Sequence, residues 1–430
     1  MNPVVLSLTF SAAILASLLV NFWLATRQMR HVAAHRGALP PAFVGVISLE
    51  SHQKAADYAL AKGRLGIVSD AFGSAVLIGW TLLGGLSWLN VAVRDLVQPH
   101  LGNMAYQLAL IGAYAAIDTL LGLPLALYAT FRLEQRFGFN NMTPGLYAKD
   151  ALKMTGLAIA IGAPFLALVL WLMQAAGSAW WLWVWAAWIS FQLLMMSIYP
   201  LWIAPLFNKF EPFTDQALIG RVSALMARCG FTAKGFFTMD GSKRSAHSNA
   251  YFTGLGAAKR VVFYDTLVTK LSVPEMEAVL AHELGHFKHR HLFKMVGTMS
   301  VFSLGALALL GWLATQWGFY SGLNVLPNLA APNNALVLLM FMLAIPPFAF
   351  FVGPLFSMMS RRDEYEADAY ARTMSSATDL VRALVKLVDG NAGTLTSDPL
   401  YVRFHYSHPP TLQRIEALGV STADLQGAAA

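Results

Sequence analysis

Seven long apolar segments constrain the fold of this chain more than any other feature. They lie at residues 4–26, 71–93, 108–131, 154–176, 180–201, 295–317 and 334–360. Each could cross a bilayer as a helix, which takes about 20 apolar residues. Only 12% of the residues are charged, whereas soluble proteins carry about 25%. The pattern predicts a polytopic α-helical membrane protein with seven transmembrane helices.

The basic residues predict how these helices are oriented. Of the 30 Lys and Arg residues, all but Arg94 fall on one side of the membrane when seven crossings are assumed. The positive-inside rule then places the N-terminus outside and the long 202–294 segment in the cytosol. Anionic lipid at that face is a sufficient partner for the net charge of +7, so we expect no nucleic-acid partner.

A His-Glu-Leu-Gly-His motif at 282–286 stands just ahead of the sixth apolar segment. In a helix, His282 and His286 are spaced i and i+4, share one face and can bind one Zn²⁺. Glu283 is then placed to act as the general base toward water held at the metal. The motif therefore predicts a zinc-dependent hydrolase.

The 202–294 segment around this motif predicts a small α+β domain. A short helix is expected at 220–230, followed by strands at 234–239, 250–255 and 260–267 with turn residues between them. Ser272 and Glu275 form a capping-box pattern that predicts the start of the motif helix.

A hydrolytic zinc site needs a third protein ligand, and the segment just beyond the seventh apolar stretch offers one. If 360–368 is helical, Glu364 and Asp368 share a face. Glu364 could bind zinc while Asp368 accepts a hydrogen bond from a ligand imidazole. By itself, the segment could instead be two positive-inside charges, Arg361 and Arg362, beside solvated acids. The first motif, at the same membrane face, favours the metal site.

Together these motifs resemble the integral-membrane zinc metalloproteases of the CAAX prenyl protease 1 family. The resemblance is carried by His-Glu-Leu-Gly-His at 282–286, Ser-Arg-Arg-x-Glu-x-x-Ala-Asp at 360–368, Asn-Ala-Tyr-Phe at 249–252, the strand at 261–267, Ser-His-Pro-Pro at 407–410 and Phe-Gly-Phe-Asn-Asn-Met-Thr at 137–143. It extends over nearly the whole chain.

The resemblance implies a fold in which seven helices enclose a chamber and carry a cytosolic gluzincin-like domain. It also implies roles for individual residues. His282, His286 and Glu364 would bind one Zn²⁺, Glu283 would be the general base, and Asp368 would support a histidine.

Further residues are implied to contact the substrate. Asn249, Ala250, Tyr251 and Phe252 would form an edge strand that pairs with an extended peptide. For the side chains of Tyr251 and Phe252, the sheet core is an equally good alternative.

Four more polar residues lie near the two motifs. His408 and Arg414 would stabilise the oxyanion near the metal, although a histidine before Pro-Pro is otherwise a turn residue. His289 and His291 lie three and five residues past His286, and we expect them near the membrane interface rather than in the same mononuclear site.

The predicted organisation has four parts: five helices in 1–201, the metalloprotease domain in 202–294, two helices in 295–360, and helices that complete the zinc site in 361–430. The predicted function is a zinc metalloendopeptidase at the cytosolic membrane face. CAAX-type prenyl protease activity, membrane-protein quality control, or both are expected, on peptide or protein substrates that include C-terminally prenylated ones. The expected location is the bacterial inner membrane, or the ER membrane in a eukaryote.

Two alternatives compete with this interpretation. In an intramembrane protease of the site-2 type, the His-Glu-x-x-His motif would lie inside a span, but Lys288, Arg290 and Lys294 follow it immediately. A transporter with an incidental metal site would explain the seven segments and the mid-span Asp118. It would leave the second motif unexplained.

Overall fold

The computed structural model describes residues 1–231, 235–253, 260–328 and 332–421, and most of them are helical. Five helical stretches are long and apolar enough to cross a membrane: Pro3–His35, Gly85–Phe137, Pro144–Ala175, Gly177–Phe207 and His291–Leu313. A sixth crossing is possible where Asn334–Ala349 and Gly353–Met374 meet at a bend of 68°. The prediction of a polytopic helical membrane protein is thus confirmed, whereas the count of seven crossings remains a prediction.

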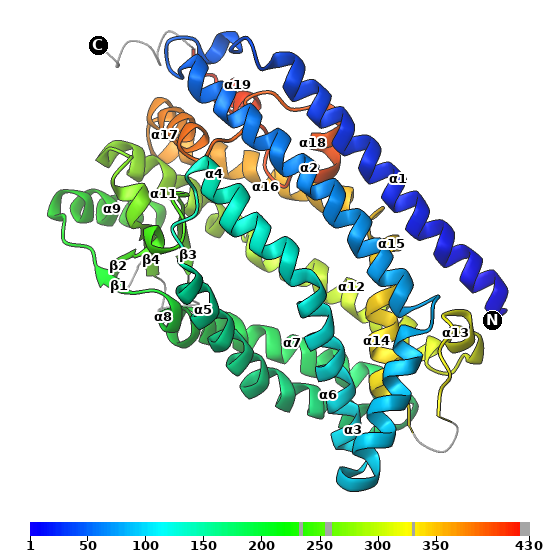
Figure 1. Cartoon of the computed structure of the whole chain (residues 1–430). Coiled ribbons are helices and arrows are strands. Elements are labelled where there is room, and N and C mark those ends of the chain that lie inside the picture. The colour runs from blue at the N-terminus through cyan, green and yellow to red at the C-terminus, as the bar shows by residue number, and fades with distance from the viewer. Residues whose placement is uncertain (232–234, 254–259, 329–331, 422–430) are drawn as a thin grey trace.

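The individual helices of the N-terminal half are long and their breaks are local (Figure 1). Their bounds are α1 Pro3–His35, α2 Leu49–Trp80, α3 Gly85–Tyr128, α4 Gln135–Phe137, α5 Pro144–Leu157, α6 Ala163–Ala175, α7 Trp180–Ile198 and α8 Ala204–Phe207. Single π-helical turns at Ala129–Glu134, Ala158–Gly162 and Tyr199–Ile203 join α3 to α4, α5 to α6 and α7 to α8, so each pair continues as one helical stretch.

The predicted span at 71–93 is not a single helix. α2 ends at Trp80 and α3 begins at Gly85, with a turn between them. Gly84 has φ 79°, a left-handed conformation that glycine adopts at little cost, and this is where the chain reverses. The residues on both sides of the turn are apolar, so the hydropathy of 71–93 is continuous and does not reveal where α2 ends and α3 begins.

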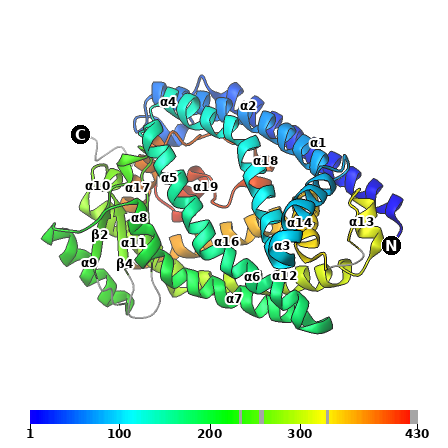
Figure 2. The same ribbon diagram turned by 60° about the horizontal axis from the view of Figure 1, so that its bottom comes forward.

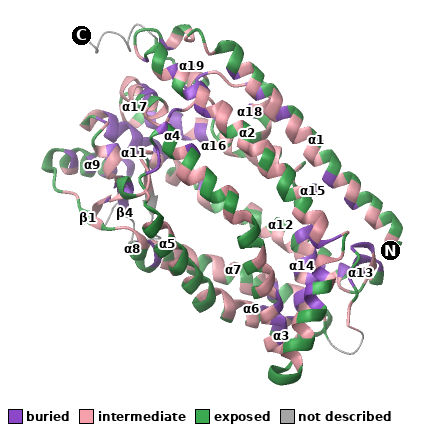
Figure 3. Cartoon of the chain, viewed as in Figure 1, coloured by how far each residue is buried: buried purple, intermediate pink, exposed green. Residues whose placement is uncertain are grey.

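Large apolar side chains cover the outside of the long helices. Val4, Leu8, Leu15, Leu19 and Trp23 of α1 are all exposed, as Figure 3 shows by the green face along that helix. Side chains of this kind avoid water, so this surface suits a lipid environment. Figure 2 shows the long helices α1 to α3 and α5 to α7 arranged in a ring rather than one close bundle, with α16, α18 and α19 seen through its opening.

A four-stranded sheet lies at one end of the long helices. Its strands are β1 Phe210–Pro212, β2 Phe236–Met239, β3 Ala250–Thr253 and β4 Arg260–Tyr264, in the order β1-β2-β4-β3. β2 and β4 are parallel and the outer pairs are antiparallel. Strands were predicted at β2, β3 and β4; β1 was missed, because three residues with one proline give no alternating pattern.

Short helices cover the sheet and form the core beside it. These are α9 Gln216–Cys229, α10 Asp265–Val268, α11 Val273–Lys288, α17 Ala377–Gly390 and α19 Thr411–Leu418. The core includes Leu218, Phe263, Leu280, Val381 and Ile415. As predicted, α11 begins with a capping box, in which the Glu275 carboxylate accepts from the backbone N–H of Ser272 at 2.7 Å.

The remaining helices link this core to the membrane part. They are α12 His291–Leu313, α13 Trp317–Gly322, α14 Asn334–Ala344, α15 Pro346–Ala349, α16 Gly353–Met374 and α18 Pro399–His405. A second core at the opposite end of the long helices includes Phe10, Leu86, Leu110, Leu170 and Leu336. The helix α16 matters most for the site, because it runs from the membrane part into contact with α11.

Candidate functional site

Two helices, α11 and α16, bring the two sequence motifs together. α11 carries the His-Glu-Leu-Gly-His motif and α16 carries the Glu-x-x-Ala-Asp motif. They approach closely at Gly285, where an added Cβ would lie 2.9 Å from the Cα of Ala367. The glycine between the two histidines therefore allows the acid-bearing helix to lie against the histidine-bearing one.

The three predicted zinc ligands converge at this contact. The Nε2 atoms of His282 and His286 lie 3.2 Å apart. Glu364 Oε2 lies 3.5 Å from His282 Nε2, and Glu364 Oε1 lies 3.4 Å from His286 Nε2. All three ligand atoms fall within 4.8 Å of one another, which is close enough for one ion to bridge them.

The chemistry of this donor set fits a Zn²⁺ ion. Glu364 is buried, and its Oε2 makes no hydrogen bond within the described part of the chain. A buried carboxylate oxygen without a partner is costly, and a bound cation would compensate it. Two imidazoles and one carboxylate are also the protein ligands of many catalytic zinc sites, in which a fourth position stays open.

A buried hydrogen-bond chain supports His282 from behind. Its Nδ1 lies 2.8 Å from Asp368 Oδ1, and Arg414 donates to both Asp368 oxygens at 2.8 and 2.6 Å. Burial favours the neutral acid, but hydrogen bonds from Arg414 and His282 outweigh it and lower the pKa of Asp368. Asp368 is thus an ionised acceptor that fixes the ring orientation of His282.

The same charges determine the protonation of the site's other groups. In the metal-free protein burial opposes protonation of His282, yet the hydrogen bond to Asp368 and the nearby Glu364 carboxylate raise its pKa to about 9. The two imidazoles of His282 and His286, in turn, lower the pKa of Glu364 despite its burial. Burial raises the pKa of Glu283 above its usual range, as suits a residue that must accept a proton and release it.

His408 reaches the site from the loop after α18. Its Nε2 lies 3.3 Å from Glu364 Oε1, while its side chain is 67% exposed, so it can turn toward a bound peptide. Arg361 anchors the end of α18 and the start of this loop: its guanidinium donates to the carbonyls of Val402 and Arg403 in the helix and of Tyr406 beyond it. Arg361 was part of a recognised motif, but sequence alone gave it no role beyond its charge.

His291, the first residue of the candidate membrane span α12, lies outside the group formed by His282, His286 and Glu364 but directly contacts one of its members. Its side chain is buried, and its Nδ1 lies 2.9 Å from Nδ1 of His286. Its Nε2 lies 3.2 Å from Glu366 Oε2. The chain turns sharply at Arg290, whose φ is 56°, and this turn folds His291 back onto the site. Residues five apart, such as His286 and His291, do not share a face of one helix, so helical periodicity does not predict this contact.

β3 lies at one edge of the described sheet, where it contacts α11. Asn249 accepts through its carbonyl from the N–H of Tyr264, so the antiparallel alternation directs the backbone groups of Ala250 and Phe252 away from β4. The side-chain oxygen of Asn249 accepts from the N–H of Ala250 at 2.8 Å. Tyr251 is half-buried, with its ring beside that of Tyr264.

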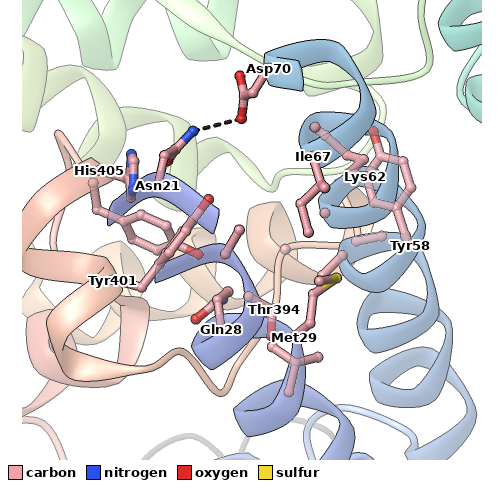
Figure 4. A pocket seen from close by; sticks show the side chains of 18 of the residues that line it. Asn21, Gln28, Met29, Tyr58, Lys62, Ile67, Asp70, Thr394, Tyr401 and His405 are labelled. Atoms are coloured by element: carbon pink, nitrogen blue, oxygen red, sulfur yellow. Dashed lines mark hydrogen bonds between the residues drawn. The ribbon is translucent and has the colours of Figure 1, made fainter. Parts of the chain in front are cut away.

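A pocket of about 540 Å³ lies between α1, α2 and the chain around α18 (Figure 4). Asn21 donates to Asp70 at 2.6 Å on its wall, while Tyr401 and His405 face the pocket from α18. None of the candidate zinc ligands lines it. Tyr406 is among its lining residues and stands two residues before His408.

Comparisons with known proteins agree with this geometry. Residues 28–209 match the family described as CAAX prenyl protease N-terminal, five membrane helices, and residues 212–421 match peptidase family M48. The chain is 35% identical to CAAX prenyl protease 1 of Saccharomyces cerevisiae, covering 88% of each protein, and 31% identical to the human homolog, covering 95% of each. The crystal structure of S. mikatae Ste24p superposes with a TM-score of 0.90 at 34% identity, covering 96% of this chain and 98% of that one. This chain therefore belongs to the CAAX prenyl protease 1 family, the membrane metalloendopeptidases of peptidase family M48.

Proposed function

We propose that this membrane metalloendopeptidase uses one Zn²⁺ held by His282, His286 and Glu364. The observation that carries the proposal is the convergence of these three ligand atoms within 4.8 Å, with a buried Glu364 oxygen left without a hydrogen bond. When bound there, Zn²⁺ would supply Lewis-acid chemistry, activating water and polarising the scissile carbonyl.

The protein's own groups carry the proton and the charge. Glu283 lies between the two histidine ligands on the same helix, and we assign it the role of general base. It takes a proton from the attacking water and passes it to the leaving amine. Asp368 and Arg414 hold His282, and His408 donates a hydrogen bond to the developing oxyanion. We thus place Arg414 behind a ligand rather than beside the oxyanion.

The β3 edge suits an extended peptide. The backbone groups of Ala250 and Phe252 that point away from β4 offer one donor and one acceptor each, as in β-augmentation. The side chain of Asn249 satisfies the Ala250 N–H in the absence of peptide, and a substrate carbonyl would replace it. We propose residues 249–252 as the backbone-binding edge that presents one peptide bond to Glu283.

Relatives named CAAX prenyl protease 1 match nearly the whole length of the chain, and we propose the same substrate class: peptides ending in a prenylated CAAX motif. We also propose seven crossings that enclose a chamber, with α2, which is long enough but is not among the apolar helices, as the remaining crossing. The four-part organisation, a gluzincin-like catalytic domain and a site facing the cytosol complete the proposal. The clustering of Lys and Arg on one side supports the orientation.

The test is zinc content and cleavage of a farnesylated CAAX peptide by purified wild-type protein and by Glu283→Gln. We expect one zinc in both proteins, and cleavage slowed by about 10²–10⁴-fold in the variant, as for loss of a general base. Glu211→Gln, at an exposed position in β1, is the matched control and should keep full activity.

The outcomes separate the parts of the proposal. If neither protein binds zinc, the metal assignment is wrong. If both bind zinc and cleave equally, Glu283 is not the base. Zinc binding without cleavage by the wild type would refute the CAAX substrate and favour another membrane-protein substrate.

A further inference from the structure

A second group of metal-binding side chains adjoins the catalytic site, on the far side of His286. Donor atoms of His289, His291 and Glu366 lie within 4.8 Å of one another. Glu366 Oε2 lies 3.9 Å from His289 Nδ1 and 3.2 Å from His291 Nε2. Asp363 Oδ1, 3.5 Å from His291 Nε2, is within reach as a fourth donor. We propose that this outer site binds a second Zn²⁺, and that the ion bound there opposes the catalytic one.

The outer site can be reached by an ion from solvent. The side chains of His289 and Glu366 are 38% and 29% exposed, whereas His291 forms the buried base of the site. Two imidazoles and carboxylates form a donor set that zinc prefers.

Two cations also face this site, and both are compatible with zinc binding. Arg362 contacts Glu366 through Oε1 at 3.2 Å, which leaves Oε2 for the metal. Lys294 approaches Oε2 at 3.5 Å, but its side chain is half exposed and can withdraw into water.

The antagonism follows from counting ring protons across the 2.9 Å contact between His286 Nδ1 and His291 Nδ1. A neutral imidazole carries one proton. If His286 Nε2 binds the catalytic zinc, its proton is on Nδ1 and is donated to Nδ1 of His291. The proton of His291 is then on Nε2, from which it is donated to Glu366. Every group is satisfied with only the inner metal present.

A metal on His291 Nε2 reverses this arrangement. The proton of His291 must then be on Nδ1, where it meets the Nδ1–H of His286. Two N–H groups cannot face each other at 2.9 Å, so one ring must turn or lose its proton. Loss of a hydrogen bond to a ligand histidine typically weakens metal binding by about 10–100-fold. By reciprocity, the inner zinc weakens the outer site by the same factor.

The inference that the outer ion inhibits rests on the proposed role of His286 as a zinc ligand. The inference that the outer site binds zinc does not depend on that role, so outer-site binding and inhibition can be tested separately. Full-length wild type, His289→Ala and the surface control His100→Ala are titrated with free Zn²⁺. Bound zinc is counted by equilibrium dialysis, and peptide cleavage is measured in parallel. His286→Ala, which lacks the inner site, is included for binding only.

We expect the wild type to bind a second zinc as free zinc rises and to lose activity over the same range. His289→Ala should keep basal activity, bind one zinc, and resist inhibition by about 10-fold or more in free zinc. His286→Ala should still bind one zinc through the outer donors. His100→Ala should behave as the wild type.

Three results would overturn the proposal. A wild type that never binds a second zinc has no outer site. Equal inhibition of wild type and His289→Ala would locate the inhibitory ion elsewhere. A second zinc that leaves both activity and the affinity of the first unchanged would refute the antagonism, even with the catalytic assignment intact.

Discussion

Replacing Asp368 by Asn should separate the support of the metal from the stability of the fold. Asp368 is 2% exposed and accepts three charge-assisted hydrogen bonds, one from His282 and two from Arg414. Asn keeps the size of the side chain but offers one acceptor and no charge. His282 loses an ionised partner, and the buried Arg414 loses its counterion.

Two magnitudes follow from these contacts. Removing one partner of a buried ion pair typically costs 3–5 kcal/mol, and we expect about 3 kcal/mol because Arg414 still lies 3.6 Å from Glu364. Weaker support of a ligand histidine should lower zinc affinity by about 10–100-fold. The pKa of Asp368 is lowered, so its contribution is present above the ordinary carboxyl pKa, near pH 4, and is lost as pH falls through its lower folded value. The same contact raises the pKa of His282 to about 9, so the share of the difference that depends on protonated His282 is complete below its ordinary pKa of 6.5 and is lost as pH rises toward 9. In the metal-free state the two proteins should therefore differ more at pH 6 than at pH 8.

The assay pairs chemical unfolding of the metal-free protein with zinc affinity measured by chelator competition, for Asp368→Asn, Arg414→Met and the double variant. We expect the double variant to regain most of the stability, because neither charge is then left unpaired, while zinc binding stays weak. Asp57→Asn, which breaks an exposed Arg–Asp pair with Arg36, is the matched control and should change neither quantity substantially. Strictly additive losses of stability in the double variant would refute the reasoning.

Two further substitutions test how α16 and α18 position the site. Gly285→Ala should push α16 away from α11, because the new Cβ would lie 2.9–3.0 Å from the backbone of Ala367, and we expect both zinc affinity and thermal stability to fall. The control is Gly220→Ala in α9, where the new Cβ meets open space. It should leave the thermal unfolding temperature unchanged or raise it slightly. Arg361→Met should release the loop that carries His408 and lower kcat about 10-fold, with zinc content unchanged. The control is Arg362→Met, which should leave kcat as it was because the Arg362 side chain is 82% exposed. Equal kcat values for the two variants would contradict the role given to Arg361.

The sequence was most informative where one helix determines the geometry. His282 and His286 share a helical face by their spacing, and so do Glu364 and Asp368, so both halves of the proposed metal centre could be predicted without a structure. The capping box fixed the start of α11 for the same reason, since its two residues lie within one turn.

Contacts across a chain reversal were not predictable in this way. His291 reaches His286 because the backbone of Arg290 adopts a left-handed conformation, which residues other than glycine rarely adopt. The break between α2 and α3 was hidden because hydropathy reports solvent preference rather than backbone direction. Arg361 acts on carbonyls of residues some 40 positions away, and no local pattern encodes such a partner.

The course of α16 explains why so many of these contacts depend on one helix. After the bend of 68° that precedes it, α16 continues as one helix from Gly353 to Met374. Arg361, Glu364 and Asp368 recur at three- and four-residue intervals: Glu364 and Asp368 contact His282 in the proposed metal centre, and Arg361 contacts the chain that leads to His408. Asp363 and Glu366 lie between them and face the outer histidines. Because all five side chains project from one continuous helix, we expect a shift of α16 at the bend to move them together, which would couple the loop that carries His408, the proposed zinc ligand and the outer site.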